Sequence, residues 1–266
     1  MKDNSMIRSY NLKKEGLAKK GKFTAVFLTD LHIRKEDASL EKIEKKIESL
    51  HPDLVLVGGD VVVAKPGQNT EYAIAFMKRI SEKYNVVYAN GNHEQRMTEC
   101  TDVYGTMGAD YDRAIADVKV TRLINQRLDL EIRGIPITIY GHQPDRRFFD
   151  KGKFPHGMED DLQDRFQKPD EKRFTILLSH NPRYEKEYLS WGADLTLSGH
   201  YHGGVVLLNS RRGLITPDFR LFSSQCCGIR EANGKKMIIS AGVGEHTVPI
   251  RVHNPKEITY ISVECS

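Results

Sequence analysis

The sequence predicts an α/β fold with a largely parallel central sheet, and two features of its apolar pattern support this. Short, uninterrupted apolar runs recur at residues 23–28, 54–57, 86–89, 174–178 and 195–197. Runs of this length are typical of strands that are buried on both faces. Helical patterns lie between several of them, and such alternation is typical of a parallel sheet. Since no repeat or low-complexity linker interrupts the chain, we expect one domain over residues 1–266.

Three helices are expected from their apolar stripes and their capping residues. Ser39 can cap the first helix. Its apolar stripe consists of Leu40, Ile43, Ile47 and Leu50. Thr70 can cap the second helix. The inward-facing residues of this helix are Ala73, Phe76, Met77 and Ile80. Asn181 and Pro182 form an N-cap and first-turn pair for a third helix over residues 183–191.

The remaining segments are more irregular. Further strands are expected at residues 205–208, 236–240 and 257–263. The first 22 residues are polar and basic, and we expect them to form an exposed lead-in. Two segments, 143–173 and 210–230, are rich in turns and carry embedded apolar residues. They are either surface insertions or walls over a site, since binding residues often lie on loops, and the first interpretation is favoured for 143–173.

Composition and charge exclude several classes of protein. Of the 266 residues, 39% are hydrophobic and 29% are charged, as in ordinary soluble domains. The formal net charge of +4 is too small to indicate a specific nucleic-acid partner. No apolar run approaches the length of a membrane span, and the N-terminus lacks an apolar signal core. The cysteines Cys100, Cys226, Cys227 and Cys265 form no disulfide framework or zinc-finger pattern, so we expect reduced thiols.

Residues that can bind a metal follow each of the five buried runs. In chain order they are Asp30 and His32, Asp60, Asn92 and His93, His180, and finally His200 and His202. Any one of them alone would be interpreted as a turn or surface residue. Because ligands of open α/β sheets gather at the carboxyl ends of the strands, we expect these side chains to converge. Oxygen and imidazole donors together suit Mn, Fe, Zn or Ni better than Ca or Mg.

The stretch LSGHYHGG carries two of these histidines, one residue apart. Residues two apart point to the same side of an extended segment, so His200 and His202 are expected to face one object there. Tyr201 would then point the opposite way and pack. The flanking glycines allow the backbone to pass close to that object.

The blocks DLH, GGD, GNHE, SHNP and GHYHGG occur in this order. They resemble the calcineurin-like metallophosphoesterase superfamily, whose pattern is DxH, GD, GNH[DE], H and GHxH. The C-terminal stretch ISAGVGEHTVPIRVHNPKEITYISV is similar to the bacterial YkuE/YaeI-type branch. That branch commonly has GHTHGGQ, whereas Tyr201 and Val205 replace the Thr and Gln here. The resemblance implies a four-layer α-β-β-α sandwich.

The resemblance also implies a role for each residue. A first metal ion would be held by Asp30, His32 and His202. A second would be held by Asn92, His180 and His200. Asp60 would bridge the two ions, and His93 would act as a general acid or a transition-state donor. The cofactors would be two divalent transition-metal ions, with Mn favoured. A metal-bridging hydroxide would attack phosphorus directly in a phosphoester, most readily a phosphodiester or pyrophosphate.

Several alternatives stay open at this point. A cyclic-nucleotide phosphodiesterase and a non-catalytic binding scaffold with the same fold are the other hypotheses. A protein phosphatase is disfavoured, because GDVVVAK has Val63 where GDxxDRG has an aspartate. The implied partner is a phosphorylated small molecule or lipid, and no protein partner is evident. Members of this branch often have an N-terminal anchor or export signal, so membrane proximity is possible and localisation stays undetermined.

Three further polar residues could belong to the site. His142 follows the run ITIYG and could face the site or serve a structural role. Arg34 could contact a substrate phosphate through its forked donors, although a solvated surface position is favoured. Glu94 completes the GNHE block and is expected only to orient its neighbours. The other histidines, His51, His156, His246 and His253, are not expected to be ligands.

Overall fold

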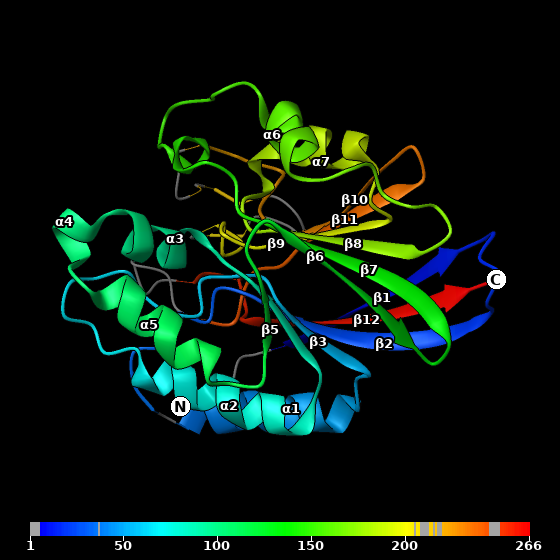
Figure 1. Cartoon of the computed structure of the whole chain (residues 1–266). Coiled ribbons are helices and arrows are strands. Elements are labelled where there is room, and N and C mark those ends of the chain that lie inside the picture. The colour runs from blue at the N-terminus through cyan, green and yellow to red at the C-terminus, as the bar shows by residue number, and fades with distance from the viewer. Residues whose placement is uncertain are drawn as a thin grey trace.

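The computed structural model describes residues 6–36, 38–204, 206–207, 213–214, 216, 220–244 and 251–266. Within these ranges the chain forms two six-stranded sheets that lie face to face. Helices cover the outer face of each sheet, so the layers run α-β-β-α (Figure 1). The predicted α/β class and the four-layer sandwich are therefore confirmed.

The first sheet has the strand order β1-β12-β2-β3-β4-β5. Its strands are β1 Met6–Lys14, β2 Gly21–Leu28, β3 Leu54–Val57, β4 Val86–Ala89, β5 Thr121–Leu123 and β12 Glu257–Cys265. The strands β2 to β5 are parallel, whereas β12 is antiparallel to β2 and parallel to β1. The helices that follow these strands are α1 Ala38–Leu50, α2 Glu71–Lys83, α3 Asn92–Glu99, α4 Thr101–Tyr104 and α5 Met107–Ala116.

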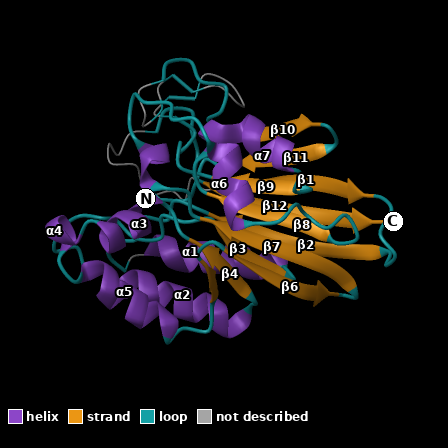
Figure 2. Ribbon diagram, turned by 45° about the horizontal axis from the view of Figure 1, so that its top comes forward, coloured by secondary structure: helices purple, strands orange, loops and turns teal. Residues whose placement is uncertain are grey.

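The second sheet has the strand order β10-β11-β9-β8-β7-β6. Its strands are β6 Gln126–Ile132, β7 Ile135–His142, β8 Phe174–Ser179, β9 Leu195–Ser198, β10 Gly228–Ala232 and β11 Lys235–Ile239. The four central strands are parallel, and the edge strands β6 and β10 are antiparallel to their neighbours (Figure 2). The associated helices are η1 Arg146–Phe149, α6 Met158–Arg165, η2 Pro182–Tyr184 and α7 Glu185–Trp191.

Three apolar layers explain why the central strands are continuous apolar runs. In β3, Leu54 and Leu56 belong to the core between the two sheets, where Phe23 and Phe174 meet edge to face at 5.5 Å. The alternate residues of β3 belong instead to the core under the helices of the first sheet. A third core lies between the second sheet and α6 and α7. Each central strand is therefore buried on both faces, as the apolar pattern indicates.

The expected helices are present, with small differences at their starts. Helix α1 begins at Ala38, so Ser39 lies in its first turn and is not its cap. Thr70 occupies the N-cap of α2 but its side chain forms no capping hydrogen bond. Asn181 does cap the third helix, because its side-chain oxygen accepts a hydrogen bond from the backbone N–H of Arg183 at 3.1 Å. The first turn of that helix is the 3₁₀ element η2, and α7 continues it.

Only some of the strands predicted for the last third of the chain lie within the described residues. The strands expected at 236–240 and 257–263 are present as β11 and β12. Of the strand expected at 205–208, residues 205 and 208 lie outside the described residues, while Val206 and Leu207 form isolated bridges. Part of the turn-rich segment 210–230 also lies outside the described residues, namely residues 210–212, 215 and 217–219. None of the helices described here is both long and apolar enough to cross a membrane.

The expected exposed lead-in is wrong, because residues 6–14 form the edge strand β1. Over its whole length β1 pairs in parallel with β12, from Met6 opposite Glu257 to Lys14 opposite Cys265. Leu12 is buried in the core between the sheets, and Tyr10 packs against that core. Most other side chains of this edge strand are exposed, so its sequence is polar and gives only a weak strand signal.

This strand gives a stability prediction. We expect Leu12→Ala to lower the free energy of unfolding by about 2–4 kcal/mol, because it leaves a cavity between the sheets. The neighbouring exposed Lys13 is the control, and Lys13→Ala should change stability by about 0.5 kcal/mol or less. Urea unfolding followed by circular dichroism measures both values. Equal stability of the two variants would show that β1 does not contribute to the core.

Candidate metal centre

The loops at the carboxyl ends of strands from both sheets meet at one place. Loops after β2 and β3 bring Asp30, His32 and Asp60 from the first sheet, and the start of α3, which follows β4, brings Asn92 and His93. Loops after β8 and β9 bring His180, His200 and His202 from the second sheet. Backbone hydrogen bonds join these loops, including His32 N–H to the Asp60 carbonyl at 2.9 Å and Gly199 N–H to the His180 carbonyl at 3.1 Å. The sheet edge predicted from the sequence is thus shared by two sheets.

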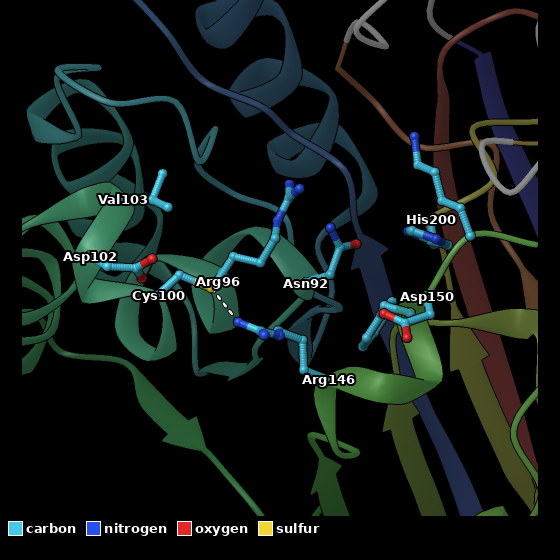
Figure 3. A pocket seen from close by; sticks show the side chains of 10 residues that line it. Asn92, Arg96, Cys100, Asp102, Val103, Arg146, Asp150 and His200 are labelled. Atoms are coloured by element: carbon cyan, nitrogen blue, oxygen red, sulfur yellow. Dashed lines mark hydrogen bonds between the residues drawn. The ribbon is translucent and has the colours of Figure 1, made fainter. Parts of the chain in front are cut away.

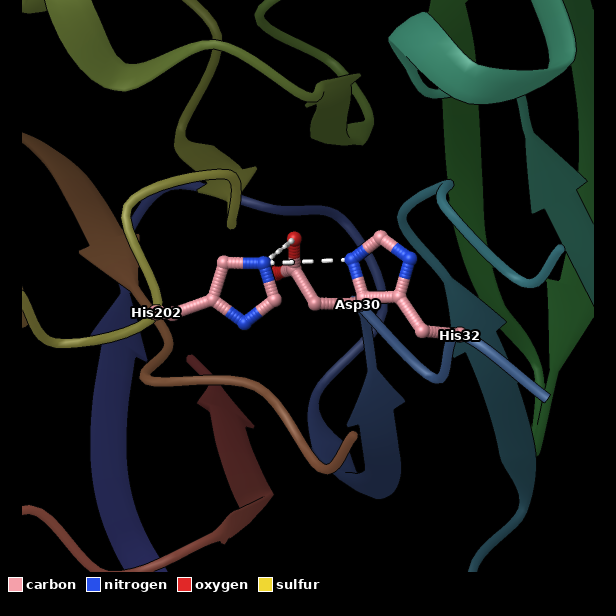
Figure 4. Close-up of side chains that lie close together, drawn as sticks. All are labelled: Asp30, His32 and His202. Atoms are coloured by element: carbon pink, nitrogen blue, oxygen red, sulfur yellow. Dashed lines mark hydrogen bonds and ion pairs between the residues drawn. The ribbon is translucent and has the colours of Figure 1, made fainter. Parts of the chain in front are cut away.

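The first group of donors consists of Asp30, His32 and His202 (Figure 4). The Nε2 atoms of His32 and His202 lie 3.1 Å apart, and His202 Nε2 is 3.4 Å from Asp30 Oδ1. The two imidazole rings stack with 4.9 Å between their centroids. Two ring nitrogens and a buried carboxylate oxygen are therefore directed at one small volume, which suits a cation.

The second group consists of Asp60, His180 and His200. His180 Nε2 lies 3.1 Å from Asp60 Oδ2. Asp60 also belongs to a group with His32 and His93, since its Oδ2 lies 3.8 Å from the Nε2 atom of each. Its carboxylate thus lies between the donors of the two halves, where a carboxylate shared by two cations would have to be.

The buried Asn92 Oδ1 has no hydrogen-bond partner among the described residues. His180 Nε2 can donate to Asp60 Oδ2 at 3.1 Å while it carries a proton, but without that proton its lone pair faces the carboxylate and has no donor. The other nitrogen of His180, Nδ1, donates to the Gly58 carbonyl at 2.7 Å. That bond orients the ring so that Nε2 faces the carboxylates. Burying polar atoms without partners is costly. A pair of divalent transition-metal ions would satisfy both atoms, so the donor set fits the predicted cofactors.

Electrostatics at the centre also favour added positive charge. Burial raises the pKa of Asp30 to about 6, and the nearby Asp60 charge adds to this. Although burial also opposes ionisation of Asp60, the histidines His180 and His93 hold its pKa well below the usual range. Burial alone would lower the pKa of His180, but Asp60 and Asp30 raise it to about 10. A proton on His180 therefore compensates the two carboxylates when no metal is bound.

The other imidazoles are available as neutral ligands. Burial lowers the pKa of His32 to about 3, despite the opposing effect of Asp60. Burial also lowers the pKa of His200 well below its usual range, and the positive charge of His180 adds to this effect. Since only a deprotonated imidazole nitrogen can bind a metal, both residues are ready to do so near neutral pH.

Five of the predicted ligands have left-handed backbone conformations. They are Asp30, His32, Asp60, His200 and His202, with φ of 54°, 46°, 53°, 67° and 48°. Such conformations cost about 1–3 kcal/mol each in non-glycine residues and are concentrated at functional sites. Hydrogen bonds between the loops maintain these strained conformations. Their concentration here is typical of a functional site.

The premise that His200 and His202 lie in an extended segment is wrong. Both residues have positive φ, and the chain turns between Gly199 and Gly204. As a result the two imidazoles reach different groups, with His202 beside Asp30 and His200 beside His180. Tyr201 between them is fully buried, as its packing role predicts.

Two glycines are required by close packing at the centre. A Cβ atom on Gly199 would collide with the side chains of Asp30 and Thr29, and one on Gly91 would collide with the Asp60 carboxylate. The absence of side chains here also lets the backbone N–H of His200 donate to both Asp30 oxygens at 3.0 Å. These glycines therefore allow the carboxylates to be enclosed by backbone.

Glu94 holds the turn that carries Asp60. Its Oε2 accepts hydrogen bonds from the backbone N–H groups of Asp60 at 2.9 Å and Gly91 at 2.8 Å. Its Oε1 accepts from Val61 at 2.8 Å and Val62 at 3.3 Å. The side chain is fully buried, and Glu94 belongs to none of the three groups of metal donors found among the described residues. The expected orienting role of Glu94 agrees with these contacts.

His93 lies at the edge of the centre with a defined tautomer. Its Nδ1 accepts a hydrogen bond from the Ala64 backbone N–H at 2.7 Å, so the ring proton is on Nε2. Burial lowers the pKa of His93 to about 4, although Asp60 opposes this shift. The imidazole is therefore neutral near pH 7 and offers an N–H donor beside Asp60.

Arg96 lies at the centre but is not among the site residues predicted from the sequence. Its Nη2 lies 3.3 Å from His93 Nδ1 and 3.2 Å from His93 Nε2. The nearly equal distances place Arg96 Nη2 over the face of the ring, out of the plane in which Nδ1 accepts and Nε2 donates. The spacing of three residues on α3 puts Arg96 on the same face as His93, and this was the available signal.

His142 and Arg34 belong to none of the groups of metal donors found among the described residues. His142 is fully buried, with Nε2 2.8 Å from Asp161 Oδ2 and Nδ1 3.0 Å from Ser179 Oγ, so it is structural. Arg34 is exposed on the loop after β2, where its positive charge contributes to lowering the pKa of His93. Cys226, Cys227 and Cys265 are buried free thiols, and Cys100 is a half-buried one.

A cavity of about 500 Å³ opens beside the centre (Figure 3). Asn92 and His200 line it together with Phe149 of η1. The Phe149 ring lies 5.4 Å from the His200 ring and 6.3 Å from the His180 ring. The favoured prediction of a surface insertion at 143–173 is therefore wrong for η1, which forms a wall of the site, whereas α6 packs on the outer face of the sheet.

Comparison with known proteins places the chain in a family. The sequence profile of the calcineurin-like phosphoesterase family matches residues 23–204. This range contains every predicted ligand, and it covers more than half of the chain. The fold, the clustered donors and this match define a metallophosphoesterase. The chain belongs to the calcineurin-like phosphoesterase family.

Three relatives illustrate the range of similarity. An uncharacterized metallophosphoesterase of Aquifex aeolicus is 25% identical over 97% of this chain and 91% of its own length. The uncharacterized metallophosphoesterase YkuE of Bacillus subtilis is 24% identical over 91% of this chain and 79% of its own length. The UDP-2,3-diacylglucosamine pyrophosphatase LpxG of Chlamydia trachomatis is 26% identical, with 69% of this chain and 64% of that protein covered.

The Glu94 contacts give a prediction about metal binding. We expect Glu94→Gln to weaken Mn²⁺ binding by about 10–100-fold, since an amide cannot accept all the backbone N–H groups that hold Asp60. Glu99, an exposed residue of the same helix, provides the control Glu99→Gln with unchanged affinity. Titration calorimetry on protein freed of metal by chelation measures both. Unchanged affinity in Glu94→Gln would exclude the orienting role.

The shifted pKa of His180 gives a pH prediction. An unfolded histidine loses its proton near pH 6.5, whereas folded His180 keeps it up to about pH 10 without metal. Its stabilising contribution is therefore complete below about pH 6.5 and is lost as pH rises towards 10.

The same proton must leave when a cation binds to His180. The affinity for Mn²⁺ should therefore rise by about tenfold per pH unit between about pH 6.5 and pH 10. Calorimetry in buffers of different ionisation heat should detect about one released proton per protein, and no release would contradict the assignment.

Proposed function

We propose that this protein is a dinuclear metal-dependent phosphohydrolase. One cation would be held by Asp30, His32 and His202. The other would be held by Asn92, His180 and His200. The observation that carries the proposal is the position of the Asp60 carboxylate between two groups of buried donors. The combination of imidazole nitrogen with carboxylate and amide oxygen suits Mn, Fe, Zn or Ni, and manganese is the metal proposed here.

The residues of the site suit hydrolysis of a phosphoester. When bound, the two cations supply charge neutralisation for the phosphate and a water molecule of lowered pKa. Asp60 would fix the separation of the two cations, because the backbone N–H of His93 donates to its Oδ1 at 2.8 Å and Glu94 accepts from its backbone N–H at 2.9 Å. Asn92 offers a neutral oxygen, which keeps positive charge at the site. The protonated Nε2 of His93 lies 3.8 Å from Asp60 Oδ2 and would donate its proton to the leaving oxygen.

The bond cleaved is proposed to be a phosphodiester or pyrophosphate in a phosphorylated small molecule or lipid. The similarity to LpxG, whose name describes a pyrophosphatase acting on a diacylated sugar nucleotide, supports this substrate class. The sequence GDVVVAK supports it further, since Val63 replaces the aspartate expected in protein phosphatases. The alternative hypothesis is a cyclic-nucleotide phosphodiesterase. If it were correct, the protein would hydrolyse a cyclic nucleotide and not these substrates.

The central test compares wild-type protein with Asp60→Asn in the presence of Mn²⁺. Hydrolysis of bis(p-nitrophenyl) phosphate should fall to background in the variant, because the amide cannot hold both cations. Asp164→Asn, on the exposed face of α6, is the matched control and should retain full activity. Two folded proteins of equal activity would refute the proposal, and a metal-loaded wild type that is inert on all phosphoesters would favour a binding scaffold.

The role of His93 can be separated from metal binding. We expect His93→Gln to lower kcat by about 10²–10⁴-fold, the usual contribution of a proton donor, while the bound Mn²⁺ per protein stays the same. The exposed His156 provides the control His156→Gln. Metal content by atomic absorption and kcat on the same samples distinguish the two roles. Loss of one metal ion in His93→Gln would show instead that His93 is a ligand.

A further inference from the structure

The cavity beside the metal centre is continuous with the proposed site. Its base is formed by Asn92 and His200, which are proposed ligands of the second cation. One wall comes from α3 and α4 of the first sheet's helices, and the opposite wall comes from η1 and the residues after it. A substrate bound at the cations would therefore extend into this cavity (Figure 3).

Basic side chains dominate the two walls. Arg96 lines the cavity from α3, and Arg146 and Lys151 line it from the opposite wall. Two carboxylates, Asp102 and Asp150, also line it, and Asp150 has an ion pair with Lys153 at 3.4 Å. The cations thus exceed the carboxylates, and together with two bound metal ions they favour an anionic ligand.

Arg96 has unused capacity to bind an anion. Its Nε atom is buried and has no hydrogen-bond partner among the described residues. Its Nη2 lies over the His93 ring, which directs the guanidinium to the boundary between the metal centre and the cavity. A buried guanidinium N–H without an acceptor is costly, and a phosphate oxygen would remove that cost.

Arg146 is positioned in the cavity by a hydrogen bond to Cys100. Its Nη1 donates to the Cys100 thiol, which lies on the opposite wall (Figure 3). This contact extends the side chain across the cavity, although Arg146 belongs to an exposed turn. Its remaining N–H donors are available there for the forked binding of a phosphate.

We propose that Arg96 and Arg146 form a binding subsite for a second phosphoryl group, directly next to the phosphate that is cleaved. The preferred substrates are then diphosphate diesters, and a simple monophosphate diester leaves the subsite unfilled. The cavity volume of about 500 Å³ is in the range of small-molecule sites and leaves room for a group beyond the second phosphate. This inference rests on the proposed function and specifies its substrate.

The test compares two substrates that share one nucleoside. UDP-glucose carries two phosphates, and the p-nitrophenyl ester of uridine monophosphate carries one. Wild-type kcat/KM should favour UDP-glucose, and Arg146→Gln should reduce that preference by about tenfold, as expected for loss of one charged hydrogen bond. Arg96 is a poorer choice for substitution, because its contact with His93 would affect both substrates.

Arg147 provides the matched control. It is the next residue of η1, but it packs over the Phe148 ring at 4.8 Å and does not line the cavity. Arg147→Gln should therefore keep the wild-type preference. If Arg146→Gln also keeps it while both substrates are hydrolysed, the subsite is excluded and the proposed hydrolase function stands.

A binding measurement separates the two proposals if hydrolysis is absent. The probe is a methylene-bridged analogue of UDP-glucose, which has the same charges and cannot be cleaved between its phosphorus atoms. Calorimetry on the Mn²⁺-loaded protein should show about tenfold weaker binding in Arg146→Gln than in Arg147→Gln. Equal affinities would overturn the subsite. Weaker binding without turnover of either substrate would support the subsite and count against the hydrolase.

Discussion

Two carboxylates are buried where the two sheets meet, and their charge governs how the loops around them are built. Asp30 and Asp60 are shielded from water, and their mutual repulsion would be severe without compensation. The protein supplies backbone N–H donors, a protonated His180 and a ring of imidazoles around them. These groups are also the ones that can bind two cations, so the electrostatic cost of folding and the capacity to bind metal have the same origin.

The surrounding architecture holds this charged centre in strained loops. Ligand residues with left-handed backbone would relax if their loops were independent, but each loop is hydrogen-bonded to another. Glu94 adds a buried carboxylate whose acceptors match the backbone donors around Asp60. Asn254, near the C-terminus, supports the loop of His202 by donating to the carbonyls of His202 at 2.6 Å and Gly204 at 2.5 Å. Rigid sheets on both sides thus fix the positions of the ligands.

The division of the site between two sheets also separates chemistry from specificity. Most donors that would hold the cations come from short loops directly after strands, and Asn92 comes from the first turn of α3. The walls of the cavity come from α3, α4 and η1, which lie farther from the strands and contact each other through Arg146 and Cys100. Changes in these walls can alter the ligand without disturbing the carboxylates, which is a common arrangement in enzymes with loops on a rigid scaffold.

The central strands, the main helices and the clustered donors can be predicted from local patterns in the sequence. Strands such as LVLV are apolar on both faces because a sheet and a helical layer both cover them, and the polar residues that follow mark one edge. Those patterns do not predict that β1 is a strand, because an edge strand can stay polar and still pair with β12. The left-handed turns of the ligands and the placement of Arg96 and Arg146 along one cavity arise from the tertiary structure. Those features depend on contacts between loops far apart in the chain, which no local pattern of residues records.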